Sequence, residues 1–262
     1  MPADEFPAIP EADQRVEADI EANILNEMIS TISFAVSRDD LKPALTGVYF
    51  KFENENLIAV ATDGHRLARY VRKDFKAGQF QGEVIVPRKF LNIITTYIPN
   101  DEPIQLWLGD NVFTATIGAD TIYTRIIDER FPDYQSVIPT DNEKEIKVSC
   151  KNLLSAVKRV SIFSNKSTHQ IAIRVESGSA TVTTEDPEKA SKAQETIEIE
   201  YAGDPIDVGY NAAYLKDILS HMNSNEIVIK LNTPISAGLF YPTPPNDNVD
   251  VTMLLMPIRL ND

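Results

Sequence analysis

The residue pair with the most obvious chemical potential is Asp63 and His65, a carboxylate and an imidazole two positions apart in the segment ATDGHRLA. A carboxylate that orients an imidazole could serve as an acid/base pair. The same segment also places an Asp-Gly pair directly after an apolar run, which is typical of a turn that follows a strand. We favour the turn, because the sequence has no G-x-S-x-G, glycine-rich phosphate loop or dinucleotide fingerprint.

The histidines and the single cysteine of the sequence do not indicate a metal or redox site. The three histidines, His65, His169 and His221, lie in different segments, and none has a second histidine at the i+2 or i+4 spacing that metal sites favour. Cys150 is the only cysteine, so neither an intrachain disulfide nor a cysteine-based metal cluster can form. We expect no metal, no cofactor and no catalytic residue. A lone cysteine and the absence of a long apolar run favour a cytoplasmic location.

The charge of the chain is strongly acidic, at −14 over 262 residues. Residues 1–22 contribute −6 of this total. An acidic total argues against a chain that coats nucleic acid with a basic exterior, although it permits a local basic surface.

The elements that position these residues follow from hydrophobic spacing. Apolar residues three to four positions apart predict helices from Asn23 to about Asp39, from Pro87 onward, at 152–163 and at 211–222. Ile24, Met28, Ile32 and Ala35 carry the first helix, with Asn23 as its N-cap, and Phe90, Leu91, Ile94 and Ile98 carry the second. Strands are predicted at 47–52, 56–62, 103–109, 111–118, 121–128, 170–177, 179–185, 226–231 and 236–242.

The order of these elements repeats. An offset of 124 residues relates Phe90–Leu91 to Tyr214–Leu215, and an offset of 123 relates Ile104 to Ile227. We interpret this as an internal duplication of an α+β unit with two helices on largely antiparallel sheets. The predicted organisation is a proline-rich linker at 1–15, one domain at 16–138 and a second at 139–262.

Three segments carry a resemblance to a known family: ATDGHRLA (61–68), RFPDYQSVIP (130–139) and MPIRL (256–260). Together, in this order, they resemble the β subunit of bacterial DNA polymerase III, the sliding clamp, over essentially the whole chain. The resemblance implies duplicated DNA-clamp domains that correspond to the middle and carboxyl-terminal domains, with the amino-terminal domain missing. It further implies a processivity factor in DNA replication, a non-catalytic subunit of the DNA-directed DNA polymerase holoenzyme. Two full-length chains of this family close head to tail into a ring around duplex DNA.

The resemblance also implies a groove for short linear peptides of DNA polymerase III and other polymerases, the clamp loader, and mismatch-repair and replication proteins. The matching positions are Leu45, Thr62, Gly64, His65, Arg66, Leu67, Pro132, Val137, Asn211, Tyr214, Leu255, Met256, Pro257, Ile258 and Arg259. Leucine and methionine suit aliphatic anchors, and Arg66 or Arg259 could meet a peptide carbonyl or carboxylate. We expect charged residues at Met256 and Leu67 to abolish binding without unfolding. The alternative is that Leu45, Val137 and Met256 are plain core residues.

Two further surfaces follow from the resemblance. The residues expected to face DNA are Arg38, Lys42, Arg88, Lys89, Lys158 and Arg159, for which a solvated helix face is the alternative. Ile162 and Phe163 match the apolar pair with which the last domain meets the first domain of the neighbouring subunit. Without that first domain, we expect a monomer or a loose dimer in dilute solution.

Two other classes of function compete with the clamp. A DNA-modifying or nucleotide-handling enzyme on a duplicated α+β fold would require a metal or phosphate site. A self-associating structural protein would bury the ATDGHRLA segment against its own chain and bind no peptide.

Overall fold

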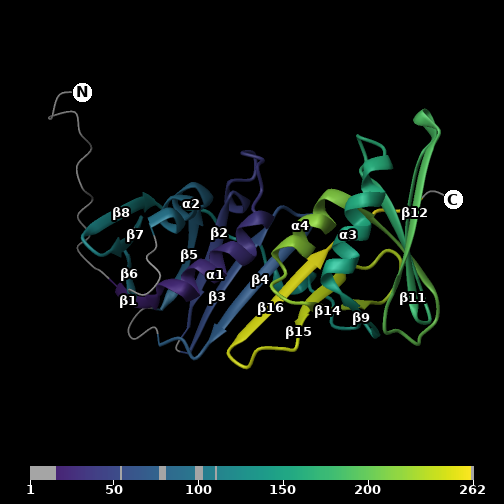
Figure 1. The fold of residues 1–262 in the computed structure, drawn as a ribbon. Coiled ribbons are helices and arrows are strands. Elements are labelled where there is room, and N and C mark those ends of the chain that lie inside the picture. The colour runs from purple at the N-terminus through teal and green to yellow at the C-terminus, as the bar shows by residue number, and fades with distance from the viewer. Residues whose placement is uncertain (1–15, 54, 77–80, 98–102, 110, 261–262) are drawn as a thin grey trace.

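The computed structural model describes residues 16–53, 55–76, 81–97, 103–109 and 111–260, so the predicted linker at 1–15 lies outside it. The chain forms the same order of elements twice, which confirms the duplication (Figure 1). The first repeat contains β1 (Val16–Glu21), α1 (Ala22–Ile32), β2 (Gly47–Phe52), β3 (Asn56–Thr62), β4 (Arg66–Lys73), β5 (Gly82–Pro87), α2 (Arg88–Tyr97), β6 (Pro103–Leu108), β7 (Val112–Ile117) and β8 (Asp120–Arg125). The second contains β9 (Lys144–Ser149), α3 (Cys150–Val160), β10 (Gln170–Glu176), β11 (Ser179–Asp186), β12 (Ser191–Glu198), β13 (Ile206–Asn211), α4 (Ala212–His221), β14 (Glu226–Leu231), β15 (Gly238–Thr243) and β16 (Val249–Leu255).

The strands form antiparallel sheets, one of which spans both repeats. Two four-stranded sheets have the orders β1-β6-β7-β8 and β12-β11-β10-β13. The third sheet has eight strands in the order β5-β2-β3-β4-β16-β15-β14-β9. Its two halves meet where β4 pairs with β16 in antiparallel register, from Arg66 opposite Leu255 to Arg72 opposite Val249. Hydrogen-bonded strands therefore fix how the two repeats lie relative to each other.

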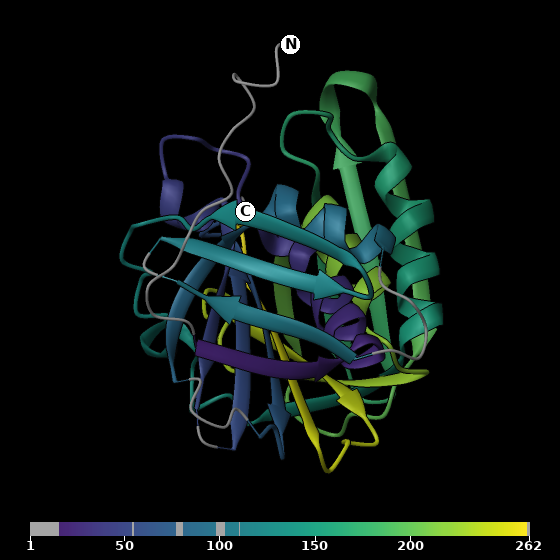
Figure 2. The same ribbon diagram turned by 90° about the vertical axis from the view of Figure 1, so that its left-hand side faces the viewer.

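The central sheet is covered on both faces. The helices α1, α4 and α3 lie across one face, as Figure 1 and the turned view in Figure 2 both show. Phe131 and Tyr134, in the segment between the repeats, pack with Tyr49 and Leu67 on the other face. This is why β2 and β3 are apolar almost throughout, whereas β12 alternates half-buried and exposed residues.

The helix ends differ in part from those predicted. Asn211 caps α4, since its side-chain oxygen accepts hydrogen bonds from the amides of Ala213 and Tyr214. The predicted N-cap at Asn23 is wrong, because β1 runs directly into α1 and the cap position is Glu21. Both α1 and α3 end earlier than predicted and continue as short 3-10 turns, at Ser33–Ala35 and Ser161–Phe163.

Among the strands of the described residues, seven were not predicted, namely β1, β4, β5, β9, β12, β13 and β16. Ile98, assigned to the second helix, lies outside the described residues.

The described residues contain neither a candidate membrane span nor a candidate metal cluster. No helix in the described ranges is long and apolar enough to cross a bilayer. In the same part of the chain, no three His, Cys, Asp or Glu side chains gather as a metal site would require.

The buried position of Cys150 generates a prediction about its reactivity. Its thiol donates a hydrogen bond to the carbonyl of Leu219 at 3.3 Å, and burial raises the pKa of the thiol. We expect alkylation at pH 8 to be more than about 100-fold slower in the folded chain than in denaturant, because the reactive thiolate is both scarce and covered. Mass spectrometry after timed exposure to iodoacetamide measures this ratio. Equal rates in the two states would contradict the burial of Cys150.

Candidate functional site at the junction of the repeats

The turn between β3 and β4 is held by the side chains of the ATDGHRLA segment. The hydroxyl of Thr62 donates to the carbonyl of Arg66 at 2.7 Å. One carboxylate oxygen of Asp63 accepts the amides of His65 at 2.9 Å and Arg66 at 3.1 Å. Gly64 has a φ of +91°, which side-chain-bearing residues rarely adopt. Asp63 therefore shapes the turn, and the turn interpretation of Asp63 and His65 is confirmed.

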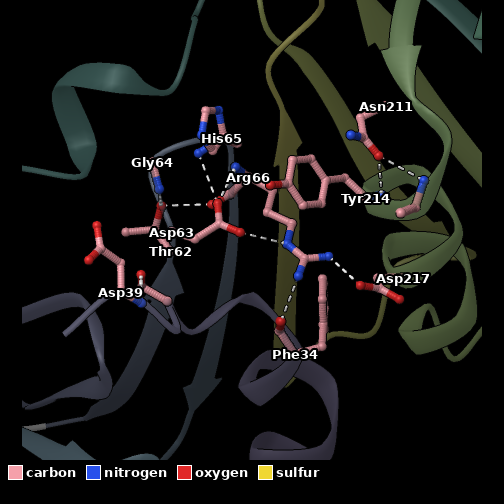
Figure 3. Close-up of polar contacts among 12 residues, drawn as sticks. Phe34, Asp39, Thr62, Asp63, Gly64, His65, Arg66, Asn211, Tyr214 and Asp217 are labelled. Atoms are coloured by element: carbon pink, nitrogen blue, oxygen red, sulfur yellow. Dashed lines mark hydrogen bonds and ion pairs between the residues drawn. The ribbon is translucent and has the colours of Figure 1, made fainter. Parts of the chain in front are cut away.

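Arg66 is the centre of a polar cluster that joins the two repeats (Figure 3). Its Nε donates to Asp63 at 3.1 Å, and its Nη2 donates to the carbonyl of Phe34 at 3.0 Å. From the second repeat, the carboxylate of Asp217 accepts Nη1 at 2.6 Å. The guanidinium also lies 4.6 Å from the ring centroid of Tyr214. Because this buried cation already has partners from both repeats, its role in the free chain is to hold the junction.

A hollow of about 250 Å³ opens beside this cluster. Its lining comes from the 3-10 turn Pro43–Leu45, the turn between β3 and β4 with its flanking residues, the segment between the repeats and the end of β16, namely Leu45, Thr62, Gly64, His65, Arg66, Leu67, Pro132, Asp133, Tyr134, Val137, Leu254 and Met256. We call this hollow the junction groove. It exists only where the two repeats meet, since it draws residues from both.

Two apolar side chains of the junction groove are open to solvent. Val137 is 53 % exposed and Met256 is 43 % exposed. The alternative that these two are core residues is therefore wrong, while Leu45 is half-buried. Leu67, by contrast, is buried in the packing of the central sheet, so a charge there would also destabilise the fold, and Met256 is the better position at which to test the groove.

The walls of the junction groove are fixed by contacts away from it. Phe131 stacks on Tyr49 with ring centroids 4.8 Å apart, and this anchors Pro132 and the following residues to the sheet. The amide of Met256 donates to the carbonyl of His65 at 2.9 Å, which ties the end of β16 to the turn. An open apolar surface on a rigid frame is typical of a binding groove.

The remaining groove residues predicted from the sequence do not line the junction groove. Tyr214 stacks on His65, with centroids 5.7 Å apart, and lines a second hollow of about 570 Å³ that shares His65 and Arg66 with the junction groove. Asn211 caps α4 and lines neither hollow. Leu255 is buried within β16, and the segment that follows it, Pro257, Ile258 and Arg259, also lines neither hollow. Within this segment, the amide of Ile258 donates to the carbonyl of Gly209.

The basic residues predicted to face DNA divide into three places. Arg38 and Lys42 line the second hollow, together with Asp39, Asp63 and Asp217. Arg88 and Lys89 open α2, and Lys158 and Arg159 lie in the last turn of α3. Arg159 forms an ion pair with Glu195, and this guanidinium holds the pKa of the Glu195 carboxyl below its usual range. Ile162 and Phe163, predicted to contact a neighbouring subunit, are both exposed.

Comparison with known proteins assigns both repeats. Residues 19–133 match the family model described as the DNA polymerase III beta subunit, central domain. Residues 135–259 match the model described as the C-terminal domain of the same subunit. The chain belongs to the DNA polymerase III beta subunit family. The two models together cover nearly all of residues 16–260.

Individual relatives agree with this assignment. The beta sliding clamp of Pseudomonas aeruginosa is 30 % identical over 261 residues, which cover 99 % of this chain and 70 % of the relative. That of Vibrio cholerae is 27 % identical, again over 99 % of this chain and 70 % of the relative.

Solved structures of the family also match. A crystal structure of the P. aeruginosa DNA polymerase sliding clamp with ligand has a TM-score of 0.93 at 29 % identity, covering 99 % of this chain and 70 % of that one. A P. aeruginosa sliding clamp bound to griselimycin has a TM-score of 0.91 at the same identity and coverage. These matches confirm the predicted α+β clamp fold.

Several residues at this junction were missed by motif matching. Asp133, Tyr134 and Leu254 line the junction groove, and Asp217 and Phe34 hold Arg66. Asp133 and Tyr134 lie inside the RFPDYQSVIP motif, so the motif itself was a signal. Asp217 carries no local signal, because it is 151 residues away from Arg66.

The burial of Arg66 generates a prediction about stability. We expect Arg66→Ala to lower the free energy of unfolding by about 1–3 kcal/mol, since it leaves the Phe34 carbonyl and the second carboxylate oxygen of Asp63 without their donor. Arg69→Ala is the matched control, because Arg69 lies on the same strand and pairs with Asp250 across the same junction in a more exposed position. The free energy of unfolding of the Arg69→Ala variant should fall by less than about 1 kcal/mol. Urea denaturation measures both, and equal losses would argue against a special role for Arg66.

Proposed function

We propose that this chain acts as a non-catalytic sliding-clamp subunit that binds partner proteins through short peptides in the junction groove. The observation that carries the proposal is the exposure of Met256 and Val137 over the groove, in a chain that belongs to the DNA polymerase III beta subunit family. The partners we propose are DNA polymerases, the clamp loader, and repair and replication proteins. The cytoplasm, where replication takes place in bacteria, is the proposed location.

The chemistry of the groove suits an aliphatic or aromatic anchor. Its floor contains Leu67, Tyr134 and Leu254, which are buried, so an inserted side chain would meet packed apolar atoms. Met256 has an unbranched and polarizable side chain that adapts to differently shaped anchors. A groove that accepts several related peptides is what a shared docking platform requires.

The polar contacts of a bound peptide would come from the rim. Gly64 and His65 are exposed at the turn, whereas the nitrogens of Arg66 already donate to Asp63, Asp217 and Phe34. We therefore assign Arg66 the task of holding the groove open and the turn rigid. Arg259, which is exposed, remains available for a peptide carboxylate.

The proposed contact with DNA is electrostatic and weak. A protein that slides needs cations directed at phosphates and no base-specific contacts. Arg38, Lys42, Lys89 and Lys158 are exposed, whereas Arg159 is engaged by Glu195. With a net charge of −14, direct affinity for duplex DNA should lie near 10⁻⁴–10⁻⁶ M at physiological salt, so retention on DNA depends on encirclement.

Peptide binding is the first test of this function. A peptide of the form Gln-Leu-x-Leu-Phe should bind with micromolar affinity, roughly −8 kcal/mol. Met256→Asp should weaken it at least about tenfold, because a charge would replace an apolar contact in the groove. Ile235→Asp is the matched control, since Ile235 is also exposed but lies outside the groove. Unchanged affinity in a folded Met256→Asp variant, measured by calorimetry, would refute the groove.

A second prediction concerns replication in a reconstituted system. Added to a full-length clamp, its loader and a polymerase, this chain should inhibit primer extension by occupying the polymerase peptide. The Met256→Asp variant should inhibit at least about tenfold less, since its groove no longer competes. Excess polymerase should relieve the inhibition. Equal inhibition by both proteins, or none by either, would show that the groove does not capture the polymerase.

A further inference from the structure

The residues that follow β16 are held by backbone hydrogen bonds to both repeats. We call residues 256–260 the MPIRL segment. At its start, the amide of Met256 donates to the carbonyl of His65 in the first repeat at 2.9 Å. Two residues later, the amide of Ile258 donates to the carbonyl of Gly209 in the second repeat, also at 2.9 Å. Met256, whose side chain lines the junction groove, is therefore placed by contacts on both of its sides.

The contact with the second repeat is made at one point on a strand edge. β13 is the outermost strand of its four-stranded sheet among the described residues, and Gly209 pairs with Ala172 of β10 on the inner side of that strand. On the open side, Gly209 and Ile258 form an isolated antiparallel bridge. A single hydrogen bond contributes little net stability, so a small local change can release the segment from β13.

Gly209 has no room for a side chain, because the MPIRL segment occupies the space. A Cβ at this position would lie 2.5 Å from the carbonyl oxygen of Ile258 and 2.8 Å from Cδ2 of Leu260. The first of these is a backbone atom, which cannot rotate aside as the end of a side chain can. Gly209 lies in regular strand register and has no positive φ, so its backbone conformation would accept alanine. The requirement for glycine therefore comes from the approach of the segment.

We propose that Gly209 is a positioning residue for peptide binding: the absence of its side chain lets the MPIRL segment lie against β13, and this holds Met256 at the wall of the junction groove. The proposal rests on the peptide-binding function proposed above. It adds a residue that acts without touching the peptide, since Gly209 does not line the groove. It also assigns Ile258 a role through its backbone amide.

The physical effect is pre-organisation of the groove. The side chain of Met256 is 43 % exposed, so packing in the free chain does little to fix it, and the backbone on both sides must do so. If the MPIRL segment left β13, a peptide would have to order it again before Met256 could serve as a contact. That ordering costs conformational entropy at the moment of binding and lowers affinity without removing any atom from the groove.

Calorimetry with the Gln-Leu-x-Leu-Phe peptide tests this on two variants that break the same contact from opposite sides. Gly209→Ala pushes Ile258 away from β13, and Ile258→Pro removes the amide that donates to Gly209. Each should weaken peptide binding at least about tenfold in a folded chain. In a Met256→Ala background, Gly209→Ala should weaken binding by less than about threefold more, because the side chain that it positions is absent.

Two matched variants separate this role from a general loss of stability. Gly203→Ala crowds another glycine of the second repeat, but the atoms that its Cβ would meet belong to Tyr201 in the same loop, so peptide affinity should be unchanged. Ile258→Ala removes the same side chain as Ile258→Pro and keeps the amide, so its affinity should stay closer to that of the unmodified chain. Urea denaturation checks that every variant is folded.

Amide exchange measured by NMR reports on the MPIRL segment directly and needs no peptide. In the free Gly209→Ala variant, the amide of Met256 should exchange at least about tenfold faster than in the unmodified chain. Saturating peptide should slow this exchange again, because binding restores the order of the segment. A structural defect elsewhere in the second repeat would not produce this response.

Three results would overturn the proposal: unchanged peptide affinity in a folded Gly209→Ala variant, an undiminished effect of Gly209→Ala in the Met256→Ala background, or unaltered exchange of the Met256 amide. An unmodified chain that binds no peptide would instead refute the junction groove. Exchange of the Met256 amide in the free Gly209→Ala variant would then still decide whether Gly209 holds the segment.

Discussion

The antiparallel pairing of β4 with β16 is the contact on which the rest of the molecule depends, because it makes one sheet from strands of both repeats. Each half of that sheet could exist within its own repeat, but only the pairing places Met256 beside the turn that contains His65. Arg66 at the end of β4 supplements the backbone hydrogen bonds with a buried cation shared by Asp63 and Asp217. The relative position of the two repeats is therefore set by hydrogen bonds, which tolerate less variation in distance and angle than apolar packing alone.

The sequence predicted the duplication, the four helices and the strands that are buried on both faces, such as β2 and β3. It did not predict most of the strands at sheet edges, among them β1, β9 and β12. An edge strand buries one face and carries charged residues on the other, so VEADIE and SKAQETIE have too few apolar residues to be distinguished from loops. β4 was missed for a different reason, since its three arginines interrupt the apolar pattern of a buried strand although Arg66 itself is buried.

At the site, motif resemblance identified most of the lining of the junction groove, and local chemistry identified the turn at Asp63. Partners brought together by the fold could not be found in this way. Asp217 and Phe34 reach Arg66 only because β4 and α4 meet across the junction, and no short-range pattern encodes that meeting. The burial of Leu67 was equally hidden, because a leucine in a motif can line a groove and still be part of the core.

The stacking of Phe131 on Tyr49 places the segment between the repeats under a mechanical constraint of its own. A connecting segment normally leaves two units free to move, whereas this one is pinned to the sheet that it crosses and forms a wall of the groove. Binding in the groove and formation of the junction are consequently linked. A ligand that binds only when the two repeats are packed together shifts the equilibrium between the packed and the separated repeats toward the packed state. A bound partner would thus stabilise the position of one repeat relative to the other, and the chain would be most rigid when a partner is bound.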